Sequence, residues 1–244
     1  MGFFHSPEIW NDYPELVAGA LAASGITDDA VVEPRLGRFT SIAEARLSAH
    51  TEAELPEIQA WRRAFSRMGL KPTQYRCAAE SLLRRYRKEG SLPQIHPLID
   101  LCNAVSIAFA MPVAVFDVAR IADFLEVRPA SGSEFYETFS GELESPAPQE
   151  VIFVDSAGAA HARRWTNRQS RRSAVSSRTS DVLIVAEALH ESADADVRRL
   201  MGTLAEELET AWSVRPTAKL LTRSSPHFTW TQGSSATEPG PERA

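Results

Sequence analysis

The spacing of apolar residues predicts helices in the first half of the chain. Between residues 58 and 68, apolar side chains recur every three or four positions, which is the period of a helix with one buried face. Pro56 suits the first turn of this helix, and Gly69 suits its end. The earlier run 15–24 is almost uniformly apolar, which fits a buried strand or a short helix. We favour the strand.

Two further helices follow the first. One has an apolar face from Tyr75 to Tyr86, with Gly90 beyond its end, and its opposite face carries several arginines. Pro97 opens the next helix, whose apolar stripe continues to Phe109. These two segments complete a group of helices in the middle of the chain.

After Pro112 the apolar period shortens, which predicts strands, two of them joined as a hairpin through Ser156-Ala157-Gly158. A long amphipathic helix is predicted at 193–212. The predicted strands are 113–118, 124–128, 150–155, 159–165 and 181–187.

The order of these elements indicates an α+β domain rather than a regular alternation of strands and helices. A chain of 244 residues with 43% hydrophobic composition can bury one sizeable core. We therefore predict a single domain over residues 1–231. Residues 232–244 are rich in Gly, Pro, Ser and Glu and are predicted to form a disordered tail.

The formal charge of −6 hides an uneven distribution. Residues 61–90 hold nine basic and two acidic residues, and residues 163–178 hold six arginines without an acid. The rest of the chain is strongly acidic. The two basic segments could form a local phosphate-binding surface, or they could be ordinary solvated helix and loop faces.

The usual catalytic and cofactor motifs are missing from the sequence. There is no nucleophile elbow, phosphate loop, zinc-protease helix or dinucleotide fingerprint, and the six histidines are scattered. Cys77 and Cys102 lie in apolar helical patterns, which predicts buried, reduced thiols. No apolar run reaches the length of a membrane span, and the N-terminus lacks the pattern of a secretory signal. We expect a cytoplasmic protein without membrane contact, metal or organic cofactor.

Polar residues interrupt the apolar helix that begins at Pro97. Asn103 and Ser106 lie in its middle, and Asp100 lies one turn before Asn103. Buried polar groups need partners, so the residues could tie the helix to a neighbouring strand. They could instead hold a water molecule and a ligand carbonyl. The pattern alone leaves both interpretations open.

Several motifs in order resemble one known family. The chain from about residue 61 to residue 190 resembles the B3/B4 domain, the editing module of the β subunit of bacterial phenylalanyl-tRNA synthetase, which also occurs as freestanding proteins. The segments that carry the resemblance are 69–76 (GLKPTQYR), 82–85 (LLRR), 92–106 (LPQIHPLIDLCNAVS), 111–117 (MPVAVFD), 124–134, 150–155 (EVIFVD) and 163–169 (RRWTNRQ).

The resemblance implies a fold and an activity. The fold is a three-layer α+β arrangement that contains an unusual β-sandwich, with helices packed outside. The activity is trans-editing, in which a freestanding deacylase hydrolyses the ester of a mischarged aminoacyl-tRNA. An activated ester needs a positioned water and stabilisation of the oxyanion more than a strong nucleophile. The expected partner is the aminoacylated 3′ end of tRNA, and no obligatory protein partner is evident.

Candidate site residues follow from the aligned motifs. Asn103 aligns with an asparagine of the synthetase editing pocket and, with Ser106 and Asp117, is predicted to place the water and the carbonyl. The carboxylates predicted to contact the substrate side chain are Glu80, Glu134 and Glu187. The residues predicted to contact the terminal adenosine and its phosphate are Arg76, Arg164, Asn167 and Arg168, because the guanidinium fork suits phosphate oxygens.

The chain departs from the synthetase pattern at two positions. Ala114 stands where the synthetase has a pocket histidine, and Val185 stands where a glutamate reads the hydroxyl of tyrosine. Glu187, two residues further on, would face the same side of a strand. Tyrosine specificity is therefore not expected. Because some freestanding relatives clear tRNA that carries canavanine, the resemblance makes a polar or cationic side chain plausible.

Two other functions fit the same sequence. The first is a non-catalytic module that binds tRNA or aminoacyl-tRNA, which the alanine at position 114 favours. The second is an interaction domain that keeps only the fold, which would be favoured if the two basic segments lay on opposite faces.

Overall fold

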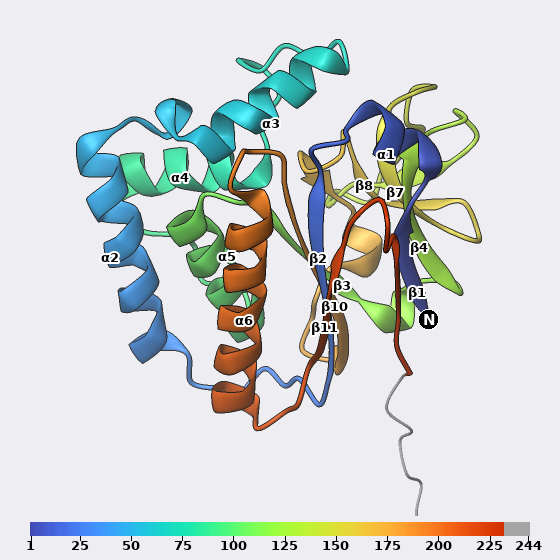
Figure 1. Ribbon diagram of the computed structural model, residues 1–244. Coiled ribbons are helices and arrows are strands. Elements are labelled where there is room, and N and C mark those ends of the chain that lie inside the picture. The colour runs from blue at the N-terminus through green and yellow to red at the C-terminus, as the bar shows by residue number, and fades with distance from the viewer. Residues whose placement is uncertain (232–244) are drawn as a thin grey trace, which may run out of the picture.

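Three layers stack across the computed structural model, which describes residues 1–231 (Figure 1). Most helices form one layer, a four-stranded sheet forms the middle and an eight-stranded sheet forms the far side. The α-helices of this part of the chain are α1 Pro7–Asp12, α2 Glu33–Ala49, α3 Pro56–Arg67, α4 Ala78–Glu89, α5 Pro97–Phe109 and α6 Ala193–Trp212. The α+β class and the three-layer arrangement predicted from the sequence are confirmed.

The middle sheet is antiparallel throughout, in the order β11-β2-β10-β3. The outer sheet has the order β12-β1-β4-β7-β8-β5-β6, with β9 paired to β8, and only the pairs β1–β4 and β5–β8 are parallel. The strands are β1 Gly2–His5, β2 Val17–Ser24, β3 Val113–Asp117, β4 Phe124–Pro129, β5 Phe135–Glu137, β6 Leu143–Glu144, β7 Val151–Asp155, β8 Ala159–Arg163, β9 Arg168–Gln169, β10 Asp181–Ala188, β11 Thr217–Leu221 and β12 His227–Thr229.

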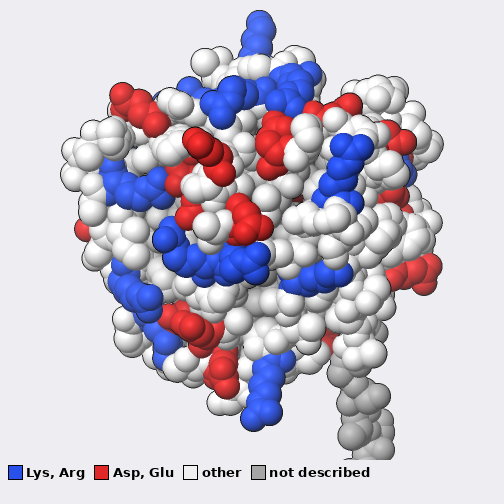
Figure 2. All heavy atoms as spheres, in the orientation of Figure 1, with Lys and Arg blue, Asp and Glu red and all other residues white. Residues whose placement is uncertain are grey.

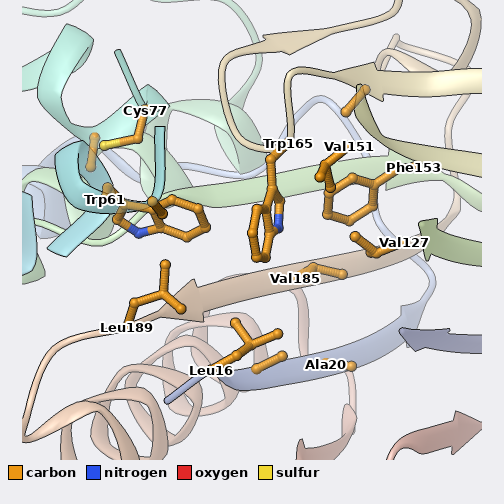
Figure 3. Packing of buried hydrophobic residues seen from close by; sticks show 14 of the residues in the cluster. Leu16, Ala20, Trp61, Cys77, Val127, Val151, Phe153, Trp165, Val185 and Leu189 are labelled. Carbon is orange, nitrogen blue, oxygen red and sulfur yellow. The ribbon is translucent and has the colours of Figure 1, made fainter. Parts of the chain in front are cut away.

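Strand β10 lies in the centre of the molecule, so both of its faces are buried. Leu183 and Val185 face the core between the two sheets, whereas Ile184 and Ala186 face the core under the helices. Alternate side chains of a strand point to opposite faces, so one strand serves two cores. Figure 3 shows Val185 on this strand below Phe153, with the indole of Trp165 standing between Phe153 and Trp61.

Helix α6 packs closely on β2 at Gly19. A Cβ atom at this glycine would lie 2.4 Å from Cγ of Met201 and 2.9 Å from Cγ1 of Val197. The missing side chain therefore sets the spacing between the helical layer and the middle sheet.

The elements with strong periodicity were predicted correctly, including the early strand and the hairpin. Tyr75 is an exception, since it lies in the turns before α4 rather than in the helix. Helix α2 was not predicted because only Phe39 and Ala43 of its seventeen residues are buried, which leaves little apolar period. Strands β1, β11 and β12 were also missed. The predicted tail at 232–244 lies outside the described residues.

Both cysteines are free and buried, as expected. Burial raises the pKa of the Cys77 and Cys102 thiols to about 12, so neither forms a reactive thiolate at neutral pH. Within residues 1–231, no helix combines the length and apolarity required to cross a membrane.

The contact at Gly19 predicts a specific loss of stability. Gly19→Ala should lower the free energy of unfolding by about 1–3 kcal/mol, because the new methyl group must push α6 away from β2. Gly202→Ala is the control, since Gly202 lies on α6 with open space around it and should gain about 0.4–1 kcal/mol. Urea unfolding measures both, and equal effects would contradict the packing argument.

Candidate functional site

A small cavity lies between the two sheets at the start of β3. Its volume of about 60 Å³ exceeds the roughly 10–15 Å³ of such space that one water molecule needs. Residues from both sheets and from the segment that follows β8 line it. The lining comprises Ala78, Pro112, Val113, Ala114, Phe153, Ala162, residues 165–169, Val185 and Glu187.

Glu187 supplies a buried carboxylate to the cavity wall. Its Oε1 lies 2.6 Å from Nε2 of His5 and accepts a hydrogen bond of 3.0 Å from Nε1 of Trp165. Its backbone carbonyl accepts a third bond from the indole of Trp61. Oε2 has no hydrogen-bond partner among residues 1–231. It is therefore the oxygen that a ligand could contact.

The cavity's outer wall is the segment 164–169, which leaves β8 through a tight turn. Arg164 and Trp165 have φ angles of 48° and 57°, a left-handed conformation that non-glycine residues adopt infrequently. Glu150 holds the turn by accepting the Arg164 N–H, and the Val151 carbonyl accepts the Trp165 N–H. The turn directs the Trp165 side chain into the core and leaves the following residues at the cavity.

Glu150 is itself fixed by Arg163, which donates two hydrogen bonds of 2.8 Å to the carboxylate. Burial opposes ionisation of Glu150, but these bonds and the guanidinium charge lower its pKa. The carboxylate is therefore ionised at neutral pH, where it accepts the Arg164 N–H.

Three uncharged polar side chains of the segment 164–169 line the cavity, beside Arg168. Oγ1 of Thr166 is buried and has no hydrogen-bond partner in the described part of the chain. Asn167 donates from Nδ2 to the Arg76 carbonyl, and Gln169 donates from Nε2 to the Val115 carbonyl. These bonds fix both amide side chains. Thr166 and Gln169 carry no local signal of a role beyond their place in the resembling segment.

The two basic segments meet beside this cavity. The Ala78 N–H donates to the Thr166 carbonyl at 2.8 Å, next to the bond from Asn167 to Arg76. The guanidinium of Arg164 stacks on the ring of Tyr75, with 4.8 Å between Cζ and the centroid. Four predicted RNA-contacting residues are thus brought together, namely Arg76, Arg164, Asn167 and Arg168.

This arrangement differs from the helical layer. There, basic and acidic side chains are intermingled over the face shown in Figure 2. Ion pairs such as Arg35–Glu207 and Arg46–Glu57 neutralise their charges. Arg168 at the cavity is more exposed, and its nearest carboxylate, Glu144, is 3.7 Å away. The cavity mouth is therefore the better place for an anion.

The residues predicted to place the water lie on α5, outside the cavity lining. Asn103 is half-buried, and its side chain makes no hydrogen bond within residues 1–231. The Ser106 hydroxyl donates to the Met111 carbonyl at 2.7 Å, just before Pro112 enters the cavity wall. Ser106 therefore fixes the chain that leads to the cavity.

Asp117 is also tied into the fold. It is buried at the end of β3, where its carboxylate accepts hydrogen bonds from the Thr179 hydroxyl and the Ala119 N–H. The bond from the Ala119 N–H caps the 3₁₀ turn Val118–Arg120. Asp117 lines a different surface from the cavity.

Two of the three predicted substrate carboxylates lie elsewhere. Glu80 is buried in the first turn of α4, with Oε1 2.5 Å from the Arg62 guanidinium. Glu134 closes a turn by accepting hydrogen bonds from the Ser131 and Gly132 N–H groups and from Arg128. Burial raises its pKa, but these bonds outweigh that effect and lower the pKa to about 2. Only Glu187 lines the cavity.

The two departures from the synthetase pattern face each other. Ala114 and Val185 are direct partners across β3 and β10, and both line the cavity. The aligned histidine and glutamate positions are therefore one apolar spot in this chain. Glu187 lies two residues along β10 from that spot.

Among the described residues, no group of three or more His, Cys, Asp and Glu side chains is arranged to hold a metal ion. The polar groups around the cavity are amides, a hydroxyl, a carboxylate and a guanidinium. Such groups can position water and stabilise negative charge.

Comparison with known proteins gives three results. The model of the B3/4 domain matches residues 60–209. The phenylalanine–tRNA ligase beta subunit of Shewanella oneidensis is 26% identical over 156 residues, which are 64% of this chain and 19% of that protein. An N-terminal fragment of the phenylalanyl-tRNA synthetase beta subunit from Pyrococcus horikoshii aligns with 88% of this chain and 49% of the fragment, at 10% identity and a TM-score of 0.47.

These matches differ in what they cover. The chain spans about a fifth of the length of the Shewanella protein, so that protein's overall activity is not transferred with the match. The B3/4 match runs from α3 to α6 and includes every residue that lines the cavity. The resemblance seen in the sequence is thereby confirmed, and the chain belongs to the B3/4 domain family.

Proposed function

We propose that this protein is a freestanding aminoacyl-tRNA hydrolase that acts in trans on mischarged tRNA. The observation that carries the proposal is the junction of the two basic segments beside a cavity with an available carboxylate oxygen. The phosphodiester end of an RNA would lie against the basic segments, and the esterified amino acid would enter the cavity. The contact between the two basic segments at residues 75–78 and 164–167 favours this proposal over the interaction-domain alternative.

The chemistry required is modest. Water adds to the carbonyl carbon of the ester, the carbonyl oxygen becomes an oxyanion, and the ribose oxygen leaves with a proton. Donors must face the oxyanion, and an acceptor must hold the attacking water. The Thr166 hydroxyl can donate, and the amide oxygens of Asn167 and Gln169 can accept because their nitrogens are already engaged. The neighbouring ribose hydroxyl can carry the proton.

The polar groups of the cavity favour a polar amino-acid side chain over an aromatic one. Oε2 of Glu187 offers an acceptor in an otherwise apolar wall, which suits a group with N–H donors. A guanidinium-like group, such as that of canavanine, would form a paired hydrogen bond with a carboxylate.

The second candidate function is a non-catalytic module that binds aminoacyl-tRNA. One observation favours it, namely the apolar pair Ala114 and Val185 where two polar groups of the synthetase pattern would stand. The deciding experiment incubates the protein with correctly and incorrectly charged tRNAs and measures released amino acid. Binding without release from any charged tRNA would establish the module and exclude the hydrolase.

The first prediction concerns the hydroxyl in the cavity. Thr166→Val should lower the deacylation rate by about ten- to a hundred-fold, because it removes a donor that faces the reacting ester while keeping the shape of the side chain. Single-turnover hydrolysis of charged tRNA measures this effect. Thr210→Val, on the exposed face of α6, should leave the rate unchanged.

The same assay separates Thr166 from the asparagine on α5. Asn103→Ala should reduce the rate by about ten- to a thousand-fold if Asn103 reaches the ester when substrate binds, as the family alignment predicts. If Thr166→Val is fully active and Asn103→Ala is not, the reacting ester lies nearer α5 than the cavity described above. Full activity of both variants would exclude both residues from the site.

The next prediction concerns the choice of amino acid. Glu187→Gln keeps an acceptor for His5 and Trp165 but removes the charge, so the fold should survive. Relative kcat/KM for a guanidinium-like side chain over tyrosine should fall about 10- to 100-fold, the worth of one charged hydrogen bond. Glu207→Gln is the matched control, since Glu207 is a buried carboxylate paired with Arg35 in the helical layer. An unchanged ratio in Glu187→Gln would remove Glu187 from substrate recognition.

A further inference from the structure

A second concave surface, separate from the cavity, carries an unusual set of arginines. It is an open groove of about 850 Å³ between the 3₁₀ turn Val118–Arg120, the 3₁₀ turn Arg171–Ser173 and the loop after β5. We call it the basic groove. Its lining includes the basic and aromatic residues Arg120, Phe139, Arg171, Arg172 and Arg178. The acidic residues in its wall are Glu137 and Asp117.

The four arginines of the basic groove form no ion pair with the rest of the described chain, although the Arg172 guanidinium stacks on the Phe135 ring, with 5.4 Å between Cζ and the centroid. In residues 1–231, none of them has a carboxylate oxygen within 4.0 Å, whereas Arg62, Arg128 and Arg163 all form close ion pairs. Asp117 is buried and already accepts two hydrogen bonds, which leaves Glu137 as the only other acid lining the groove. Four cations against two acids leave a net positive surface, and such a surface attracts phosphate.

An exposed aromatic ring lines the same groove. The Phe139 side chain is 66% exposed, in a turn that Thr138 closes by accepting the Glu142 N–H. Single exposed apolar residues are common and need no explanation alone. Beside several free guanidinium groups, however, such a ring completes the combination that binds single-stranded nucleic acid, since bases stack on aromatic faces and phosphates contact arginines.

The basic groove continues from the cavity along two stretches of chain. Strand β3 has Ala114 at the cavity and Asp117 at the groove, which are three residues or roughly 10 Å apart in an extended strand. The segment after β8 likewise has Arg168 and Gln169 at the cavity and Arg171 at the groove. A strand of RNA that leaves the cavity therefore meets the groove within a few nucleotides.

We propose that the basic groove binds the single-stranded 3′ end of the RNA whose terminal ester occupies the cavity. The arginines hold its phosphates, and Phe139 stacks on one of its bases. The identity of the RNA rests on the proposed function, whereas the groove itself rests on its charge, its ring and its position. The terminal ester and the nucleotides that precede it thus occupy two adjacent sites.

The test is a coupling measurement with uncharged tRNA. Affinity is measured for intact tRNA and for tRNA trimmed of its single-stranded 3′ nucleotides, using the wild type and Arg171→Gln/Arg172→Gln. The double variant should lose about ten-fold or more in affinity for intact tRNA, and its salt slope should fall by about 1 to 1.5, at about 0.7 for each single-strand phosphate contact. It should lose little for trimmed tRNA. Phe139→Ala should lose about 5- to 100-fold for intact tRNA only.

The matched control is Arg198→Gln/Arg199→Gln, an adjacent arginine pair on α6 in the helical layer, which removes the same charge. Equal losses for intact and trimmed tRNA would show that the groove contacts the duplex, and no loss would show that it contacts no RNA. Either result overturns the proposal. Because the assay needs no ester, its outcome is independent of catalysis. If the protein hydrolyses charged tRNA but the arginine variants do not distinguish intact from trimmed tRNA, the proposed function stands and the RNA-binding role of the basic groove is rejected.

Discussion

The buried carboxylate of Glu187 is the interaction on which the site depends. A buried carboxyl group between two sheets is costly unless hydrogen bonds satisfy it, and here an imidazole and an indole contact the same oxygen. His5 comes from β1 of the outer sheet, and Trp165 comes from the turn after β8, so one side chain joins three distant parts of the chain. The bonds fix the Trp165 side chain and with it the start of the segment that forms the cavity's outer wall.

The left-handed turn at Arg164 and Trp165 follows from the same constraint. Two consecutive non-glycine residues in this conformation need external support, which Glu150, Val151 and Glu187 supply. The turn places amide, hydroxyl and guanidinium groups at one edge of the sandwich. The rigid core thus presents a short polar segment between a cavity and a basic groove, and this arrangement suits a ligand with a small head and a charged backbone.

The sequence predicted the architecture better than the site. Periodicity located α3 and α6 because each has one buried face, and apolar composition located α5 and the hairpin because they are largely buried. Helix α2 has too few buried residues to show a period. The resemblance identified segment 163–169 and pointed to Glu187, but also to Glu80 and Glu134, whose buried charges serve arginines and backbone N–H groups. Only three-dimensional contacts separate these roles. His5 could not be foreseen at all, because its partner lies 182 residues away and β1 precedes the resembling region.

The strands outside the family match have a consequence for how this domain can be divided. Residues 60–209 contain the cavity lining, yet β2 lies between β10 and β11, and β1 lies between β4 and β12. Cutting the chain to the matched span would expose the hydrogen-bonding edges of β10 and β4 and remove the imidazole that holds Glu187. The cavity wall and its scaffold therefore do not form a transferable cassette. A chimaera that borrows this wall must also borrow the first two strands, or find a host that offers its own strand and histidine in their place.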